Sequence, residues 1–389
     1  MSNETALHSP LISYALGGLD RCWLESDGRW SHIYHLDGRD VPNESKPASD
    51  AFYTLNVLLG MSRLASVPPH LNLPEIFERN ASALSALPAP VYAYGMALWS
   101  AAELGLPLPR QLAKFVRELL QNVGAWRGFR AQDLGMLLCG VIAQAQCGRQ
   151  EWGRFASPLY DHLRRHYRRS SALFCDAPSG WRSRFGTFAT QTYLTIATYR
   201  YGEFLDDRTA IEAAKASARK IISMQGPNGE WPWFFDAVAG RVVDFYEVYS
   251  VHQFGMAPAF LELAEKHGVD GSHEAMIKGF NWVLGQNQLR KLMLATPLQL
   301  TIRSQLRKGE SASKFPRAVR ALTNSLLRRS SGVAPNSQID LRLECRSYEL
   351  GWILWSFGRR ADLPELTHNS AFIRGSSAPV ETHSARAFT

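Results

Sequence analysis

Apolar residues recur at helical spacing in twelve separate segments of this 389-residue chain, and this repetition constrains the fold more than any other feature. Residues three or four positions apart lie on one face of a helix, so each segment predicts a helix with a buried side. No sustained alternation of apolar and polar residues predicts a strand. We therefore expect an all-α protein. The predicted helices cover residues 10–24, 50–67, 73–87, 90–105, 109–123, 131–147, 154–169, 187–204, 208–224, 247–266, 273–286 and 345–359.

Twelve consecutive helices form six hairpins, about one for every 60 residues. A simple bundle does not need so many hairpins, whereas a closed ring does. We expect a single (α/α)6 toroid of six helical hairpins over residues 1–363, with a basic insertion at about 289–338. Residues 364–389 are rich in Ser, Ala, His and Arg, and this composition predicts a disordered tail.

The lengths of the connections predict which face of the ring carries function. Connections after odd-numbered helices are mostly long, whereas those after even-numbered helices are mostly six residues or fewer. If outer and inner helices alternate, all the long connections lie on one face, beside the N-termini of the inner helices. Long loops on a rigid scaffold are the usual place for binding and catalysis. The long connections are 25–49, 124–130, 170–186, 225–246 and 287–344.

The composition, 46% hydrophobic and 20% charged, is that of a globular chain with a large core. No apolar run is long enough to cross a bilayer, and the first residues lack the pattern of a secretory signal. Five widely spaced cysteines predict free thiols in a reducing compartment, so we expect a cytoplasmic protein. The net charge of +8 comes mainly from arginine and favours an anionic partner. No nucleic-acid-binding motif is found, so we do not expect nucleic acid.

One segment carries a recognisable motif. Gln225, Gly229 and Trp231 follow a predicted helix with the spacing Q-x-x-x-G-x-W, which resembles the QW repeat of terpenoid cyclases. Residues 23–30, WLESDGRW, form an imperfect second copy. The resemblance implies a toroid of helical hairpins, an architecture shared with sugar-processing enzymes, and implies no particular chemistry. A structural role also fits, with Gln at a helix end, Gly in a turn and Trp packed on the next hairpin.

A second segment, residues 281–287 with the sequence NWVLGQN, resembles the W-x-L-G-x-N segment that closes a late helix in endoglucanases of the six-hairpin glycosidase superfamily. Gln288 stands where those enzymes have proline, and their catalytic Asp pair and terminal Glu motif are not recognisable here. The resemblance therefore implies the toroid and not cellulase activity. A plain helix C-cap at Gly285 or Asn287 is the alternative interpretation.

Charged and aromatic side chains gather in the long connections. Aromatic rings stack on the apolar faces of sugars, and Asp and Arg bind hydroxyl and acid groups, so this mixture predicts a carbohydrate site. The many arginines favour an acidic sugar. The predicted substrate-binding residues are Trp30, His35, Asp37, Arg39, Asp40, Glu44, Arg127, Arg182, Arg184, Gln191, Trp231, Trp233, Tyr249, Gln253, Glu344 and Arg346.

Four residues are candidates for catalysis: Glu247, Asp50, His252 and Asp244. Asp50 and Glu247 lie where predicted inner helices begin, although acids also suit that position as caps or through the helix dipole. Two carboxylates from different hairpins predict hydrolysis of a glycosidic bond, so we expect a protein that binds and hydrolyses an anionic oligo- or polysaccharide. A set of Tyr, His and Arg groups instead predicts a lyase or epimerase that removes a proton next to a uronate carboxylate.

Two other classes of protein share the architecture. A terpenoid cyclase or prenyltransferase would need a DxDD, DDxxD or zinc motif, and Asp206-Asp207 is followed by Arg208 with no third Asp. A toroid that binds glycans without catalysis is the other alternative. His32 and His35 have no second pair of zinc ligands, and glycine-rich phosphate loops are missing, so we predict no metal and no cofactor.

The insertion contains a basic amphipathic segment at 314–329. Phe315, Val319, Leu322 and Leu326 follow helical spacing, and most of the basic residues lie off this stripe. The segment predicts a helix that packs its apolar stripe on the ring, a lid, a partner site or peripheral contact with a membrane.

Overall fold

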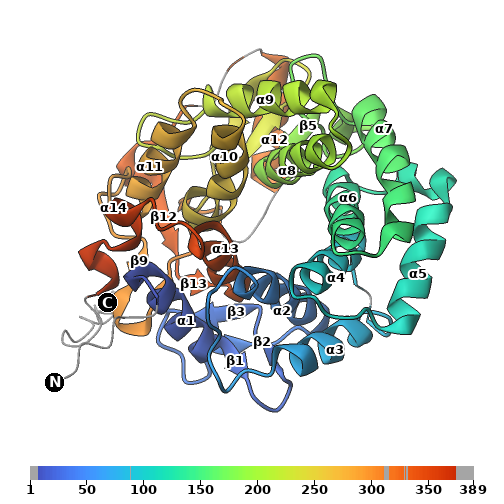
Figure 1. Cartoon of the computed structure of the whole chain (residues 1–389). Helices are drawn as coiled ribbons and strands as arrows, with labels where there is room; N and C mark the ends of the chain where they lie inside the picture. Colours follow the sequence, from blue (N-terminus) through green and yellow to red (C-terminus); the bar gives the residue numbers. More distant parts are fainter. Residues whose placement is uncertain (1–7, 88, 311–314, 328, 330–331, 374–389) are drawn as a thin grey trace.

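Two concentric rings of helices make up most of the computed structural model, which describes residues 8–87, 89–310, 315–327, 329 and 332–373 (Figure 1). Each of the twelve predicted segments overlaps one of these helices, so the (α/α)6 toroid is confirmed. The inner ring contains α2 (Pro47–Met61), α4 (Val91–Glu103), α6 (Ala131–Gln146), α8 (Phe188–Leu205), α10 (Ala257–Lys266) and α13 (Ser347–Phe357). The outer ring contains α1 (Pro10–Cys22), α3 (Leu73–Ala83), α5 (Arg110–Gln121), α7 (Ala156–His166), α9 (Arg208–Ile222) and α11 (Ser272–Val283).

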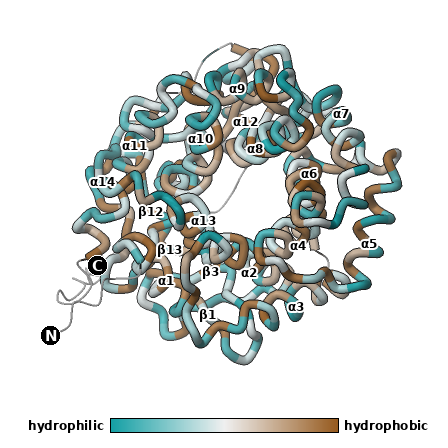
Figure 2. Tube along the Cα trace, in the orientation of Figure 1, coloured by the Kyte–Doolittle hydropathy of each residue, from teal (hydrophilic) through white to brown (hydrophobic). Residues whose placement is uncertain are grey.

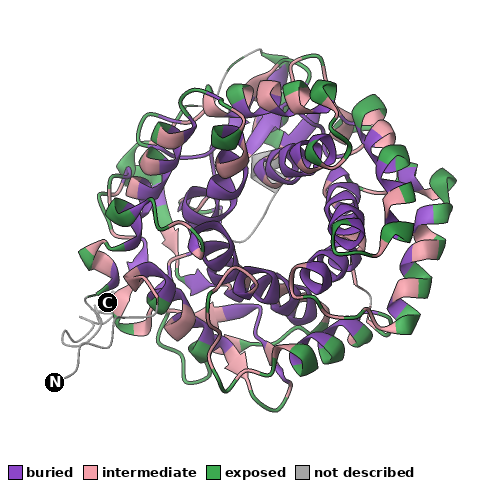
Figure 3. Ribbon diagram, viewed as in Figure 1, coloured by how far each residue is buried: buried purple, intermediate pink, exposed green. Residues whose placement is uncertain are grey.

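Burial differs between the two rings. In the outer helix α5, Leu112, Val116 and Leu120 are buried at a spacing of four residues, and the other positions are partly or fully exposed. In the inner helix α6, every residue except Gln132 and Gln146 is buried, because the helix contacts neighbours on both sides and an outer helix behind it (Figure 3). Figure 2 shows the corresponding concentration of hydrophobic residues along α6.

The ring closes where the last inner helix, α13, packs against the first, α2. Gly60 of α2 and Gly351 of α13 lie at this contact. A methyl group at Gly60 would come within 2.2 Å of the Gly351 carbonyl oxygen, so no larger residue fits without moving a helix. The two backbones therefore approach closely, and the hairpins form a closed toroid.

Five small sheets among the described residues are an addition to the predicted all-α fold. Their strands contain only two to four residues, too short for a recognisable alternation. They join the connections that precede α2, α8, α10 and α13, so these long connections share one face, as expected. The sheets are β1 (Trp23–Leu24) with β2 (Arg29–Trp30); β3 (Ile33–His35) with β4 (Asn43–Glu44) and β13 (Glu344–Cys345); β5 (Phe185–Thr187), β6 (Phe234–Asp236) and β7 (Arg241–Asp244); β8 (Val248–Tyr249), β11 (Ser304–Arg307) and β12 (Ile339–Arg342); and β9 (Leu294–Ala295) with β10 (Leu300–Thr301).

The helix of the insertion, α12 (Phe315–Leu326), lies against the ring through the buried Ala321 and through polar residues. Ser325 donates a hydrogen bond of 2.7 Å to Asp236, and the amide of Asn324 donates one of 3.0 Å to the carbonyl oxygen of Val243. The packing of an apolar stripe on the ring is therefore wrong for three residues, because Val319, Leu322 and Leu326 are 47%, 51% and 74% exposed. The buried carboxylate of Asp236 requires polar partners, and these decide which side of α12 faces inward.

The predicted disordered tail is folded at its beginning. A short helix, α14 (Pro364–Thr367), follows the ring, and Leu366 and Phe372 are buried. The ring of Phe372 lies 5.4 Å from that of Tyr14 and 6.0 Å from that of Phe280. The prediction rested on the average composition of residues 364–389, in which two buried apolar residues carry little weight. Residues 374–389 lie outside the described part of the chain. Within the described residues, no helix combines the length and apolar character needed to cross a membrane.

Candidate functional site

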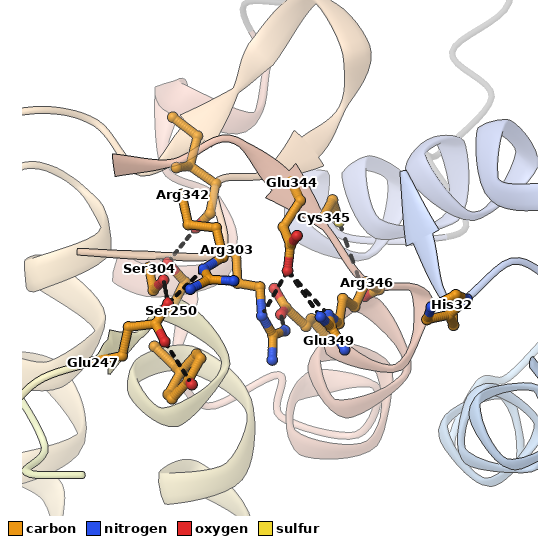
Figure 4. Close-up of polar contacts among 12 residues, drawn as sticks. His32, Glu247, Ser250, Arg303, Ser304, Arg342, Glu344, Cys345, Arg346 and Glu349 are labelled. Carbon is orange, nitrogen blue, oxygen red and sulfur yellow. Dashed lines mark hydrogen bonds and ion pairs between the residues drawn. The ribbon is translucent and has the colours of Figure 1, made fainter. Parts of the chain in front are cut away.

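Arg303 lies at the centre of a polar cluster on the face of the long connections (Figure 4). It lies between β10 and β11, and its Nη1 forms an ion pair with Glu349 in the first turn of α13. Its Nε lies 3.1 Å from Glu344 Oε1, and its guanidinium carbon lies 4.8 Å from the centroid of the Tyr249 ring. The Nη2 atom has no hydrogen-bond partner among the described residues. The two carboxylates thus hold the guanidinium group and leave its Nη2 donor unpaired within the described part of the chain.

A second guanidinium group, that of Arg346, shares one of these carboxylates. Its Nη2 lies 3.0 Å from Glu344 Oε1, and its Nη1 donates a hydrogen bond of 3.1 Å to the hydroxyl of Tyr53. The rings of Tyr53 and Tyr348 are 4.6 Å apart, and Tyr348 also lies near Arg303. Arg346, Tyr53 and Tyr348 are all partly exposed. Two arginines bordered by tyrosines suit an anionic ligand with an apolar ring face.

The carboxyl group of Glu349 is fully buried behind Arg303. Burial raises its pKa to about 7, against the opposing effect of Arg303. Thr301 donates a hydrogen bond of 2.9 Å to its Oε2 atom. This carboxyl group therefore changes its protonation state near neutral pH.

Glu247 is also buried but remains ionised. Its Oε1 atom lies 2.6 Å from Arg342 Nε and accepts a hydrogen bond of 2.9 Å from Ser304, while its Oε2 atom accepts one of 2.8 Å from the hydroxyl of Tyr249. Burial opposes ionisation, but Arg342 and these hydrogen bonds together hold the pKa of Glu247 below its ordinary value. Both carboxylate oxygens of Glu247 therefore accept hydrogen bonds, and the bond from the hydroxyl of Tyr249 positions that side chain.

His252 lies in a π-helical turn, His252–Met256, that leads into α10. The imidazole ring lies 5.0 Å from the ring of Tyr249 and 4.5 Å from that of Phe188. Burial, with a contribution from the nearby Arg303, lowers the pKa of His252 to about 3. Its buried Nδ1 atom has no hydrogen-bond partner among the described residues. The side chain is therefore a neutral imidazole within the cluster.

Asp50 and Asp244 are not free to act as acids or bases. Asp50 Oδ1 accepts a hydrogen bond of 2.8 Å from the backbone of His32, and Oδ2 accepts bonds from Ser45 and from the backbone of Lys46. Asp244 lies 2.8 Å from Arg307 and 3.5 Å from the α12 residue Arg320. Both carboxylates therefore bind groups of the protein itself, and the catalytic roles predicted for Asp50 and Asp244 stay predictions.

Four residues predicted to bind substrate belong to the core. Trp30 and Trp231 are fully buried, and Trp231 packs 5.6 Å from Phe188. Gln191 exchanges two hydrogen bonds with the backbone of Phe174, and Gln253 accepts one from the backbone of Trp231. These buried side chains support the loops. In the sequence, a large or polar residue near a predicted loop looks the same whether it packs in the core or binds a ligand.

The predicted surface residues divide into small pairs. Asp37 and Arg39 pair with each other, and both are exposed. His35 lies 2.8 Å from Glu44 at the edge of the face. Arg182 lies 3.7 Å from Asp176, and Arg184 lies 2.8 Å from Asp236 beneath α12. Trp233 stacks on Phe234, whereas Asp40 and Arg127 are exposed. Of the predicted binding residues, only Tyr249, Glu344 and Arg346 lie in the cluster around Arg303.

The QW-like segment has the structural role that the sequence allowed. The side-chain amide of Gln225 donates hydrogen bonds of 3.0 and 2.9 Å to the carbonyl oxygens of Gly229 and Ala275. Gly229 has a φ of +98°, and a methyl group there would come within 2.1 Å of the Lys278 carbonyl oxygen. The motif therefore ties a connection to the next outer helix.

Arg303, Glu349, Tyr53 and Tyr348 are the main residues of the cluster that the predicted site omitted. Arg303 lies in the segment treated as an insertion. Residues 300–307, LTIRSQLR, do alternate in polarity, which is a weak strand signal that would have placed Arg303 on a defined face. Among the described residues, no three side chains of His, Cys, Asp and Glu are grouped as a metal site.

Comparisons with known proteins show the fold. No family model and no curated protein sequence matches the chain. Cellobiose 2-epimerase from Bacillus thermoamylovorans aligns over 90% of this chain and 97% of its own, with a TM-score of 0.62 and 10% identity. The α-1,6-mannanase of Salegentibacter, in complex with α-1,6-mannotriose, covers 90% and 98%, with a TM-score of 0.55 and 10% identity. Unsaturated glucuronyl hydrolase from Bacillus sp. GL1 covers 92% and 97%, with a TM-score of 0.54 and 14% identity. The chain therefore has the (α/α)6 toroid of six-hairpin glycosidase-like proteins, and these neighbours are carbohydrate-active enzymes.

Proposed function

We propose that the chain is an enzyme that binds an acidic sugar and moves a proton at the carbon next to its carboxylate, as a uronate lyase or epimerase does. The observation that carries this proposal is the buried imidazole of His252, which lies 5.0 Å from the Tyr249 ring in a cluster where Arg303 Nη2 has no hydrogen-bond partner among the described residues. The proteins of similar fold named above act on sugars. One of them is an unsaturated glucuronyl hydrolase, which supports an acidic sugar as the substrate class.

Arg303 and Arg346 supply the binding step. A uronate carboxylate accepts hydrogen bonds from the free Nη2 of Arg303 and from the partly exposed Arg346, while the sugar ring lies against Tyr53 or Tyr348. Pairing with two guanidinium groups draws electron density from the carboxylate. It therefore makes the neighbouring carbon a stronger acid and stabilises the negative charge that develops when its proton leaves.

His252 supplies the proton transfer. The imidazole is neutral, so it has a lone pair that accepts the proton from the carbon. The positive charge of Arg303 disfavours protonation of His252. The carboxylate of a bound substrate offsets this charge, so binding of the substrate raises the basicity of the imidazole. Tyr249, held by Glu247, lies within the same cluster as a hydroxyl that delivers or receives the second proton. Return of a proton to the other face gives an epimer, and loss of a leaving group gives an unsaturated product.

Hydrolysis is the second candidate, and the opposite pKa shifts of two carboxyl groups favour it. The pKa of Glu349 is raised to about 7, whereas that of Glu247 is lowered, which is the division expected of an acid and a base. However, both oxygens of Glu247 already accept bonds within the protein, and Glu349 is buried behind Arg303. Proton transfer by His252 requires neither group to be released.

Incubation of the protein with oligosaccharides of glucuronate, mannuronate or guluronate in heavy water tests the proposal. We expect deuterium to enter the sugar at the carbon next to the carboxylate, or an unsaturated uronate to form, and we expect His252→Gln to abolish either product. His273→Gln is the matched control, because His273 lies partly exposed on the outer helix α11. New reducing ends without deuterium exchange would support hydrolysis instead, and the lack of any product with all three substrates would contradict both reactions.

A further inference from the structure

A cavity of about 280 Å³ opens on the other face of the toroid, between the C-terminal ends of the inner helices. The cluster around Arg303 lies at their N-terminal ends. The inner helices contain 10 to 18 residues, so at about 1.5 Å per residue they separate the two places by roughly 15 to 27 Å. The cavity is therefore distinct from the candidate site.

Two tryptophans form the wall of this cavity. The rings of Trp99 and Trp355 meet edge to face at 5.2 Å. The guanidinium group of Arg200 lies 4.8 Å from the centroid of Trp99, and Glu103 accepts hydrogen bonds of 3.0 Å from both Arg200 and the Trp99 indole. The polar groups on this side of the cavity therefore already have partners.

Other side chains of the lining have unused hydrogen-bonding groups. Arg63 lies with its guanidinium carbon 3.9 Å from the centroid of Trp355, and its side chain makes no hydrogen bond within the described chain. Its Nε atom is buried and has no hydrogen-bond partner among the described residues, and within that part of the chain its ion pair with Glu262 is long, at 3.7 Å. Glu262 accepts no side-chain hydrogen bond among the described residues. A buried donor without a partner is costly, and a ligand that supplies an acceptor removes this cost.

We infer that this cavity binds a neutral polyhydroxylated molecule of about the size of one sugar ring. A pair of neighbouring hydroxyl groups accepts from Arg63 and donates to Glu262, which neither a simple anion nor a simple cation does. The volume lies just below the range of about 300 to 1,000 Å³ for ligand pockets, so the ligand is small. The charged side chains of the lining balance, which disfavours an ion: Arg63, Arg200 and Lys266 against Glu103, Glu203 and Glu262.

Isothermal titration of the full-length protein with D-glucose, D-mannose and D-galactose tests this inference independently of the proposed reaction. We expect saturable binding of at least one of these sugars, and we expect Arg63→Met and Glu262→Ala each to weaken it at least tenfold. Arg303→Lys should leave this binding unchanged, because that residue lies on the other face. A sugar seen in the cavity after soaking a crystal of the unmodified protein would support the inference even if a variant failed to fold.

Three results would overturn it. The first is the lack of saturable binding by all three sugars. The second is binding that Arg303→Lys weakens and folded Arg63→Met does not, which would place the sugar at the candidate site. The third is binding of inorganic phosphate that Arg63→Met abolishes while no sugar binds, which would make the cavity an anion site. Circular dichroism and the unfolding temperature establish that each variant is folded.

Discussion

The guanidinium carbon of Arg303 lies 4.8 Å from the centroid of the Tyr249 ring, and the hydroxyl of the same tyrosine donates to Glu247. Tyr249 thus contacts a cation through its face and a carboxylate through its hydroxyl group. Glu349 pairs with Arg303 from α13, while Tyr249 belongs to the connection that leads to α10. The cluster therefore depends on two inner helices and on the connections between them, and a change at either end alters the position of Arg303.

Arg303→Lys should lower kcat/KM for an acidic sugar at least about 100-fold. A lysine has one ammonium group on a flexible stem and does not reproduce the planar fork that contacts Glu344, Glu349 and a ligand together. Steady-state kinetics on the uronate oligosaccharide that gives product would measure the loss. Arg329→Lys, at an exposed position, is the control and should keep full activity. Full activity of the Arg303 variant would show that this residue does not bind the substrate.

His252 should make the protein less stable in acid. Its pKa in the folded state, about 3, lies below the ordinary value of 6.5, so the unfolded chain binds more protons between these values. The stability is fully present above pH 6.5 and is lost as the pH falls toward 3, by at most about 1.4 kcal/mol per pH unit. Urea unfolding at pH 7 and pH 4.5 should show a smaller acid loss for His252→Gln than for the unmodified protein. An equal loss in both would contradict the buried, neutral imidazole.

Glu349 should make the protein less stable as the pH rises, which is opposite to the effect of His252. Its pKa in the folded state, about 7, lies above the ordinary value of 4.5, so its contribution is fully present below pH 4.5 and is lost as the pH rises through 7. Glu349→Gln resembles the protonated form and removes this dependence. The variant should gain stability relative to the unmodified protein between pH 5 and pH 8. Glu118→Gln, exposed on α5, should show no such gain, and a gain there would mean that net charge is the cause.

The sequence alone was sufficient to predict the toroid, because each helix buries a face with regular spacing. Leu112, Val116 and Leu120 show why: their spacing alone predicts the buried side of α5. The site was only partly predictable, since Arg303 acquires its position from Glu344 and Glu349, which are more than 40 residues away in sequence. Strands of two to four residues create these contacts and leave almost no periodic pattern. Residue type alone named Tyr249, His252 and Arg346, which the structure brings together around Arg303, but it did not separate them from buried residues such as Trp231.

Gly229→Ala should destabilise the protein strongly. The new methyl group would come within 2.1 Å of the Lys278 carbonyl oxygen, and the φ of +98° is unfavourable for alanine, so we expect a loss of more than about 2 kcal/mol. Gly128→Ala is the matched control because no atom lies within 4 Å of its added methyl group. Its free energy of unfolding should change by less than about 0.5 kcal/mol. Equal stabilities of the two variants would show that the QW-like turn is not tightly packed.

The exposed face of α12 should bind an anionic membrane surface. Leu322 and Leu326 are 51% and 74% exposed one turn apart, and the surrounding segment is basic. A basic helix with an outward apolar face is suited to insertion at the lipid interface. Leu322→Gln with Leu326→Gln should leave the unfolding temperature unchanged, because neither side chain packs on the ring, and should abolish sedimentation with phosphatidylglycerol vesicles. Leu205→Gln, exposed at the end of α8, should still sediment. If the unmodified protein stayed in solution with these vesicles, or if the double variant still sedimented, α12 would not be a membrane-binding element.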